Sequence, residues 1–329
     1  MSESNQEFEG SESATKEEPR ERLERITGSV KRFRDERIRA QEAASIAAPG
    51  SWHVALVGLT PSGAALPWTS EIATLKDVSS PPSLVSLSGA IAATHYLGFV
   101  AQWASITRYE LVLNDEFQDE KYIDGIGWTF ICGIRMISEC EFIAPIAADR
   151  SWDTVAGITD SSVIVKLLED DRKARTTGRG ERATLSPTQF KWVDDNFLSI
   201  LTLREDRRFQ LALESLSLSF TLDSPRVCIF VVWSGIEALF GIKDELRFRL
   251  ALYVSVLTRK AGPDRERRFG EVRKLYDTRS RVVHGAPTDK DDLITHLLEV
   301  RQVLRDCLCS IVSRGTMAEP QILEAEFLN

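Results

Sequence analysis

The hydrophobic and polar positions of this 329-residue chain change their pattern near residue 185. Before that point the pattern is mixed. After it, apolar residues recur at spacings of three and four, which is typical of amphipathic helices packed in a bundle. This region is predicted to contain helices over approximately 187–203, 205–221, 226–240, 245–258, 266–284 and 289–313.

Several helix ends in this region have recognisable signals. Ser186-Pro187 and Ser224-Pro225 each place a capping residue before a proline at the first helical position. Gly285, with Pro287 just beyond it, predicts the end of the fifth helix. The helix over 226–240 is apolar on nearly all sides, so we expect it at the centre of the bundle.

The preceding residues predict a mostly helical α+β domain with a few strands. Strands are expected at 51–59 and 161–168, a loop through residue 83, and long helices over about 88–112 and 120–147. The fold class is therefore mainly α, with a C-terminal bundle behind this domain. The expected boundaries are an arm over 1–48, an N-terminal domain over 49–170, a linker over 171–185, a bundle over 186–315 and a tail over 316–329.

The arm is dense in charge, and its first 18 residues are predicted to be disordered. Residues 19–46 could form a helix with a thin apolar stripe at Ile26, Val30 and Phe33. Such a helix would be either a solvated arm or a surface that docks on the body or on a partner. The sequence leaves both interpretations open.

One segment has the length of a membrane span. Residues 78–107 contain 30 consecutive positions without Asp, Glu, Lys or Arg. Many of these positions are Ser, Thr, Gly or Gln, which makes the segment more polar than an inserted helix. We therefore expect a buried helix and no membrane partner.

Charge and cysteine content limit the possible environments. The net charge is −8, but residues 186–315 hold 21 Lys and Arg against 18 Asp and Glu, so only this part is suited to a polyanion. The five cysteines form no zinc-type spacing and no even set, and the first residues are acidic, unlike a secretory signal. These features predict reduced thiols and a cytoplasmic location.

The chemistry-bearing candidate is Arg279-Ser-Arg-Val-Val-His284, which closes the fifth predicted helix. The Arg279 guanidinium can donate two hydrogen bonds to a phosphate, and His284 can transfer a proton near neutral pH. Five positions of an ideal helix separate the two side chains by about 140°. The turn expected at Gly285 would allow the His284 ring to approach Arg279. By itself, an Arg-x4-His pattern also occurs by chance.

The wider sequence context resembles a known family. Trp233-Ser-Gly-Ile-Glu-Ala-Leu-Phe240, Glu245-Leu-Arg-Phe-Arg-Leu250 and Tyr276-Asp-Thr-Arg-Ser-Arg-Val-Val-His-Gly285 together resemble the ApeA-like branch of the HEPN superfamily, over roughly residues 187–312. The resemblance implies a bundle of four or five helices. In many members of the superfamily this bundle is a metal-independent ribonuclease that acts as a toxin or in defence against phage.

The resemblance also implies residue roles. RNA would be cut by attack of a ribose 2′-oxygen, with His284 as the acid or base and Arg279 stabilising charge on the phosphate. Glu237 would orient Arg279 or tune His284, and Ser280 occupies a position that is usually polar. No cofactor or metal is implied. A homodimer is implied, and an antitoxin or a sensor is a possible further partner. The alternative is a non-catalytic HEPN module for dimerisation or for binding RNA or protein.

Basic residues lie just before the motif and within it. Arg273, Lys274 and Arg281 are candidate RNA contacts, although a solvated helix face paired with neighbouring acids is an equal alternative. Tyr276 could stack on a base, but core packing is the favoured interpretation.

Other candidates carry weaker signals. The acidic runs 169–171 and 194–195 could bind a divalent cation, but consecutive acids usually mark a solvated loop. His53 and His95 are expected to be structural histidines in apolar surroundings. His296 is expected at the surface of the last bundle helix.

Overall fold

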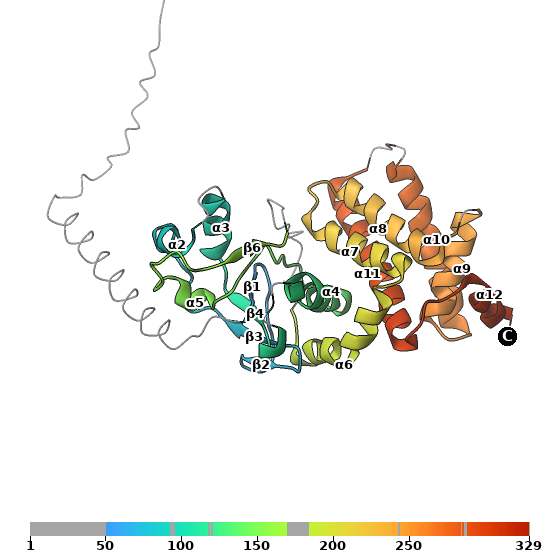
Figure 1. Cartoon of the computed structure of the whole chain (residues 1–329). Coiled ribbons are helices and arrows are strands. Elements are labelled where there is room, and N and C mark those ends of the chain that lie inside the picture. The colour runs from blue at the N-terminus through green and yellow to red at the C-terminus, as the bar shows by residue number, and fades with distance from the viewer. Residues whose placement is uncertain are drawn as a thin grey trace, which may run out of the picture.

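The computed structural model describes residues 51–92, 96–117, 119, 121–169, 184–242, 244–283, 285 and 288–328. This part of the chain forms an antiparallel sheet flanked by helices, and beside it a helical bundle (Figure 1). The expected mainly helical fold class is confirmed. The predicted arm over 1–48 and most of the predicted linker over 171–185 lie outside the described residues.

Among the described residues, six strands form one sheet in the order β2-β3-β4-β1-β5-β6, with every neighbouring pair antiparallel. The register places His53 of the central strand opposite Val112 on one side and Ala148 on the other. The strands are β1 (His53–Leu56), β2 (Trp68–Thr69), β3 (Ala73–Asp77), β4 (Tyr109–Leu113), β5 (Ile146–Ala148) and β6 (Val165–Leu167).

The sheet separates two apolar cores, because successive side chains of a strand point to opposite faces. Val54 and Leu56 of β1 enter the core that faces the bundle, whereas Ala55 enters the opposite core. The opposite face is covered by the short helices α2 (Leu84–Ala90), α3 (Leu97–Ala104) and α5 (Trp152–Val155), and the bundle-facing side by α4 (Trp128–Ile137).

Two helix predictions for this domain were wrong. The expected helix over 88–112 is divided between the end of α2, α3 and strand β4, and the expected helix over 120–147 is reduced to a π-helical turn at Ile123–Gly127 followed by α4. The expected loop before residue 83 contains β2 and β3. The strands at 51–59 and 161–168 are confirmed by β1 and β6. None of the described helices combines the length and apolar composition needed to cross a bilayer.

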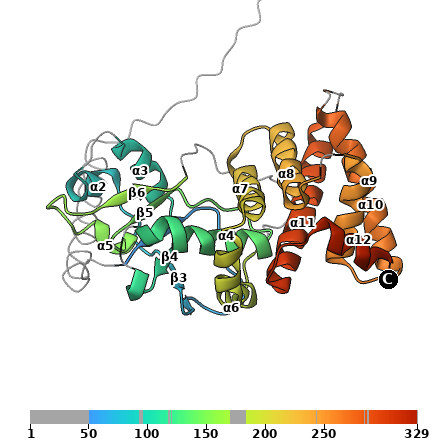
Figure 2. The same ribbon diagram turned by 45° about the vertical axis from the view of Figure 1, so that its right-hand side comes forward.

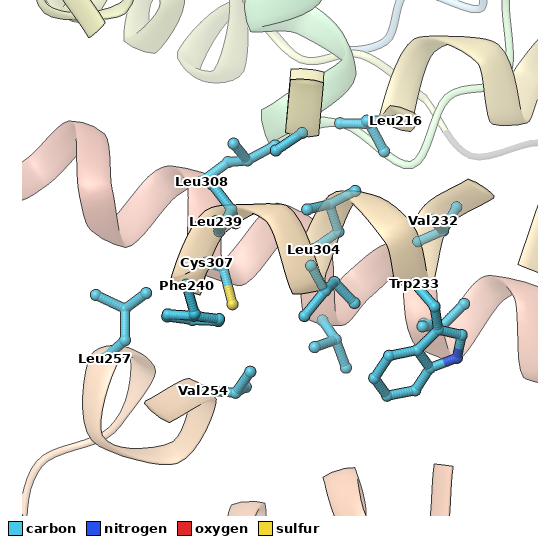
Figure 3. Packing of buried hydrophobic residues seen from close by; sticks show 14 of the residues in the cluster. Leu216, Val232, Trp233, Leu239, Phe240, Val254, Leu257, Leu304, Cys307 and Leu308 are labelled. Atoms are coloured by element: carbon cyan, nitrogen blue, oxygen red, sulfur yellow. The ribbon is translucent and has the colours of Figure 1, made fainter. Parts of the chain in front are cut away.

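The six predicted bundle helices are all present. They are α6 (Pro187–Leu203), α7 (Arg207–Thr221), α8 (Pro225–Phe240), α9 (Leu246–Thr258), α10 (Pro263–Val283) and α11 (Lys290–Arg314). As expected, α8 is central: its Val232, Trp233, Leu239 and Phe240 pack among residues of α7, α9 and α11 (Figure 3). Gly235 allows α7 to approach closely, because a Cβ there would lie 2.7 Å from the Ser215 Cβ.

The boundary between the two parts is less sharp than the sequence predicted. Helix α6 packs on the sheet through Phe190 and Phe197, whereas Ile200 and Leu203 in its last turn belong to the bundle core. Helix α4 is shared in the same way, since Phe130 lies in the sheet core and Met136 in the bundle core. The two domains therefore share a continuous apolar contact.

Buried arginines add polar contacts between the two parts. Arg301 of α11 donates to a Glu141 carboxylate oxygen at 2.7 Å and to Ser219 Oγ at 2.9 Å. Arg305, one turn later, donates to the Ser138 carbonyl at 3.2 Å. Since a buried charge is tolerated only when it is paired, these contacts fix α11 against the segment that follows α4.

The segment expected to be a C-terminal tail contains a docked helix, α12 (Pro320–Leu328). Its Leu323 is fully buried in the bundle core, and Glu326 accepts two 3.0 Å hydrogen bonds from Arg314. Figure 2 shows α12 beside α9 and α10, at the end of the molecule farthest from the sheet. The bundle therefore extends beyond the predicted boundary at residue 315.

Candidate functional site

The candidate site lies where α8 and α10 pack together. Glu237 follows Trp233 by one turn on α8, and Tyr276 precedes Arg279 by one turn on α10, so each pair shares a face of its helix. The end of α10 is fixed by two backbone contacts. Arg226, in the first turn of α8, donates to the Val282 carbonyl at 3.1 Å. Gly285 has a positive φ of 77° and donates to the same carbonyl, which confirms the expected glycine cap.

Glu237 and Arg279 form an ion pair, with 3.2 Å between Oε1 and Nη2. The side chains are only 23% and 17% exposed, respectively, so solvent screens their attraction less than at an open surface. The Arg279 guanidinium also lies 5.4 Å from the centre of the Tyr276 ring. That ring meets the Trp233 ring edge to face at 5.4 Å. The four side chains form one contiguous cluster, which we call the Arg279 cluster.

Burial sets the electrostatics of this cluster. It raises the pKa of the Glu237 carboxyl, and the charge of Arg279 offsets that rise only in part. Burial also raises the pKa of the Tyr276 hydroxyl, with Arg279 opposing the shift and Glu237 adding to it. The cluster is therefore an environment in which negative charge is costly unless the guanidinium is close to it.

Three polar atoms of the cluster retain hydrogen-bonding capacity. Trp233 Nε1, Glu237 Oε1 and Arg279 Nε are buried, and none has an aligned hydrogen-bond partner among the described residues. The Glu237–Arg279 contact is thus an ion pair without the alignment of a hydrogen bond. Because buried polar atoms are normally bonded, the cluster is suited to receiving a polar group from outside.

The candidate RNA contacts fall on two different faces of α10. Arg273 and Tyr276 line an open hollow of about 650 Å³ together with residues 244–248 of the α9 start. The Arg273 guanidinium lies 5.5 Å from the Phe269 ring centre, and Phe269 meets the exposed Phe248 edge to face. Lys274 and Arg281 instead line a groove between α10 and α11. The structure therefore does not bring all three basic residues to one surface.

The remaining candidates of the motif are less well defined. Ser280 is partly buried on α10. His284 lies outside the described residues, so the predicted approach of its ring to Arg279 stays a prediction. Trp233 was missed as a member of the site, although its place one turn before Glu237 on a central helix was the available signal.

Two of the weaker predictions require correction. His296 was expected at the surface but is only 4% exposed, because α10 covers its side of α11. Glu169 was expected in a solvated loop, yet it is buried in an ion pair with Arg135 at 2.7 Å and accepts a hydrogen bond from the Ala144 backbone. In both cases a tertiary neighbour supplies burial that local polarity did not indicate.

The expectation for His53 agrees with the structure: it is buried on β1, with Nδ1 3.2 Å from a Glu110 carboxylate oxygen. Lys76 also contacts Glu110, at 2.9 Å, and Ser151 donates to it at 2.8 Å. Burial alone would raise the pKa of Glu110. The His53 hydrogen bond and the charges of His53 and Lys76 outweigh burial and lower it to about 2. This cluster joins strands to α5 and has a structural role. His95 lies outside the described residues.

Comparisons of the chain with family models, with curated proteins and with solved structures found no match. The assignment of a function therefore depends on the geometry of the site and on the resemblance described above.

Proposed function

We propose that the helical bundle is a HEPN-type endoribonuclease that cleaves RNA without a metal ion, with Arg279 and His284 as its catalytic residues. The observation that carries the proposal is the environment of the Arg279 side chain. Its guanidinium is largely buried, supported by Tyr276 and Glu237, and keeps an unpartnered Nε among the described residues. A pre-positioned guanidinium of this kind is suited to charge that develops on a phosphate.

The proposed reaction is a transesterification. The ribose 2′-oxygen loses its proton and attacks the adjacent phosphorus, while the bond from phosphorus to the 5′-oxygen breaks. The products are a 2′,3′-cyclic phosphate and a 5′-hydroxyl, and the departing 5′-oxygen gains a proton. His284 transfers protons in this step, and Arg279 stabilises the negative charge on the non-bridging oxygens.

Glu237 is a positioning residue in this proposal. It holds Arg279 against Tyr276 before substrate arrives, and its pKa, raised by burial, makes its charged form easier to neutralise. When a phosphate approaches Arg279, the guanidinium can turn its free Nε toward the phosphate while Nη2 stays near Glu237.

The hollow beside the Arg279 cluster supplies a path for the strand. Arg273 and Arg247 are its basic residues; Arg247 is already paired with Asp277, and the acidic Asp244 and Glu245 also line the hollow. Tyr276 and Phe248 present aromatic surface. A flexible single strand is recognised by this combination, because cations contact the backbone and aromatic rings stack on unpaired bases. We therefore expect single-stranded RNA to be the preferred substrate.

The dimer that the resemblance implies would use the outer face of α8. Val227 and Phe230 are 47% and 48% exposed there, on the helix that carries Glu237. Phe230→Glu should convert a dimer to a monomer in light scattering. Leu198→Glu, at an exposed position on α6, is the matched control and should leave the mass unchanged.

The second candidate function is a non-catalytic HEPN module for dimerisation or for binding RNA or protein. The observation that favours it is the existing pairing of Arg279 with Glu237, which would also suit a purely structural arginine. An effector role as a toxin or in anti-phage defence follows only from the first candidate.

The deciding experiment incubates the purified full chain with single-stranded RNA in EDTA. Cleavage that yields 2′,3′-cyclic phosphate ends, and that is lost in both Arg279→Ala and His284→Ala, supports the enzyme. Arg267→Ala is the matched control, because Arg267 is an exposed arginine of α10 paired with Asp264 and should keep full activity. RNA binding without cleavage in the parent protein would support the second candidate, and equal cleavage by all variants would show that the activity lies elsewhere.

A further inference from the structure

The groove between α10 and α11 has the features of a ligand site separate from the Arg279 cluster. Its volume is about 690 Å³, which is within the usual range for small-molecule pockets. Neither Arg279 nor Glu237 lines it. On α10, Lys274 and Arg281 are displaced by about 200° around the helix from Tyr276 and Arg279, respectively, so the two sites use different faces.

The two walls of the groove carry opposite charges that do not pair with each other. Lys274 and Arg281 lie two turns apart on α10, and Asp292 and Glu299 lie two turns apart on α11. No ion pair joins these four side chains to one another or to other described residues. Arg281 is instead oriented by a 3.1 Å hydrogen bond from Nη2 to the Thr278 hydroxyl.

A buried imidazole provides an independent indication of a ligand. His296 lines the groove between the two acidic positions, and its Nε2 is buried without a hydrogen-bond partner among the described residues. Burial and the nearby charge of Arg281 lower the pKa of His296 to about 4, so the ring is neutral at physiological pH. A neutral imidazole offers one donor and one acceptor, and a buried nitrogen of this kind normally has a partner.

The charged residues that line the groove indicate which class of ligand it can bind. The other charged residues of the groove are already engaged: Arg268 pairs with Asp306 and Glu271, and Asp289 caps α11. The charges of Lys274, Arg281, Asp292 and Glu299, which have no ion pair among the described residues, sum to zero. A polyanion would meet two carboxylates, and a polycation would meet two basic groups. A molecule carrying one charge of each sign satisfies both walls.

We propose that this groove binds a zwitterionic small molecule of the amino-acid or short-peptide type. Its carboxylate contacts Lys274 and its ammonium contacts Glu299. Arg281 and Asp292, each two turns away along its helix, attract the same two ends at longer range. A polar group between these ends bonds to His296 at the floor. The site does not depend on catalysis at Arg279.

The test is calorimetric titration of the full chain with trialanine, which has free termini, and with N-acetyl-trialanine amide, which has the same body without charges. Titration with free L-alanine shows whether a single amino acid is sufficient for binding or a peptide is required. We expect trialanine or L-alanine to bind and the blocked peptide not to bind. Binding of the blocked peptide as tight as that of trialanine, or no binding by either zwitterion, would overturn the proposal.

Single substitutions test whether the ligand binds in this groove. Lys274→Met and Glu299→Gln are changes at the groove walls that should leave the fold intact, and each should weaken binding about tenfold, since each removes one charged hydrogen-bond partner. His296→Phe should weaken it as well, with circular dichroism confirming the fold. Arg267→Met and Arg279→Ala should leave it unchanged. Loss of binding in Arg279→Ala alone, or tighter binding of adenosine monophosphate than of either zwitterion, would contradict the assignment.

Discussion

Glu237 of α8 and Arg279 of α10 form an ion pair with 3.2 Å between Oε1 and Nη2, yet neither Glu237 Oε1 nor Arg279 Nε has an aligned hydrogen bond within the described part of the chain. The pair therefore neutralises charge in a largely buried place without using all of its donors and acceptors. A structural ion pair of maximal stability would be better aligned. This geometry suits an arginine that receives a second acidic group.

Removing Arg279 should make stability depend on pH through Glu237. In Arg279→Met the carboxylate stays buried without its counter-charge, which should cost about 1 kcal/mol at pH 7. The pKa of Glu237 is already raised by burial and would rise further without Arg279. Its folded-state pKa then exceeds the unfolded value. The destabilisation caused by Arg279→Met should therefore diminish as the pH falls through the pKa that Glu237 has in the folded protein, toward the pKa that it has in the unfolded chain.

Urea unfolding of the parent and of Arg279→Met between pH 7 and pH 4.5 measures this effect. The double variant Glu237→Gln/Arg279→Met is the control, because an amide does not titrate. Its loss of stability relative to the parent should not diminish as the pH falls. A destabilisation by Arg279→Met that stays constant across this range would show that Glu237 does not sense Arg279.

Glu110 should give the opposite pH dependence. Its pKa is lowered to about 2, because the His53 hydrogen bond and the charges of His53 and Lys76 outweigh the effect of burial, which would raise it. The stabilisation is fully present above the unfolded pKa and is lost as the pH falls toward the folded value. Glu110→Gln should thus destabilise the protein by about 3 kcal/mol at pH 7, and the difference should shrink below about pH 4.5.

Unfolding followed by fluorescence at several pH values checks this expectation. Glu116→Gln, at an exposed carboxylate of the turn Asp115–Phe117, is the matched control and should change stability by less than about 0.5 kcal/mol. Equal losses for the two variants would mean that the buried cluster does not stabilise the sheet.

The close contact between α7 and α8 should make Gly235 sensitive to substitution. A Cβ at Gly235 would lie 2.7 Å from the Ser215 Cβ, so Gly235→Ala should separate the helices and cost about 2 kcal/mol despite the higher helix propensity of alanine. Gly270 lies within α10 with open space around it, and Gly270→Ala should stabilise the protein by about 0.5–1 kcal/mol. Urea midpoints of the two variants that move in the same direction would contradict the packing.

Much of the bundle was predictable from local information. The three- and four-residue apolar spacing and the proline and glycine signals located α6–α11, because these signals depend only on residues within or next to each helix. The strands β3 and β4 were not predictable in the same way. Tyr109–Leu113 continues an apolar run that also suits a helix, and only pairing with β1 and β3 makes it a strand.

The features of the candidate site also fall into two groups, those set by the local sequence and those set by tertiary packing. The sequence by itself determined that Arg279 lies on a helix that ends at a glycine, and that Glu237 lies on a central helix. The resemblance implied that Glu237 would act on Arg279 or His284, and the tertiary structure shows its contact with Arg279. Only the tertiary structure decided that Lys274 and Arg281 face a different groove from Arg273, and that His296 is buried. The physical reason is that the period of a helix fixes which residues share its face. The neighbour that covers that face is set by packing between distant segments.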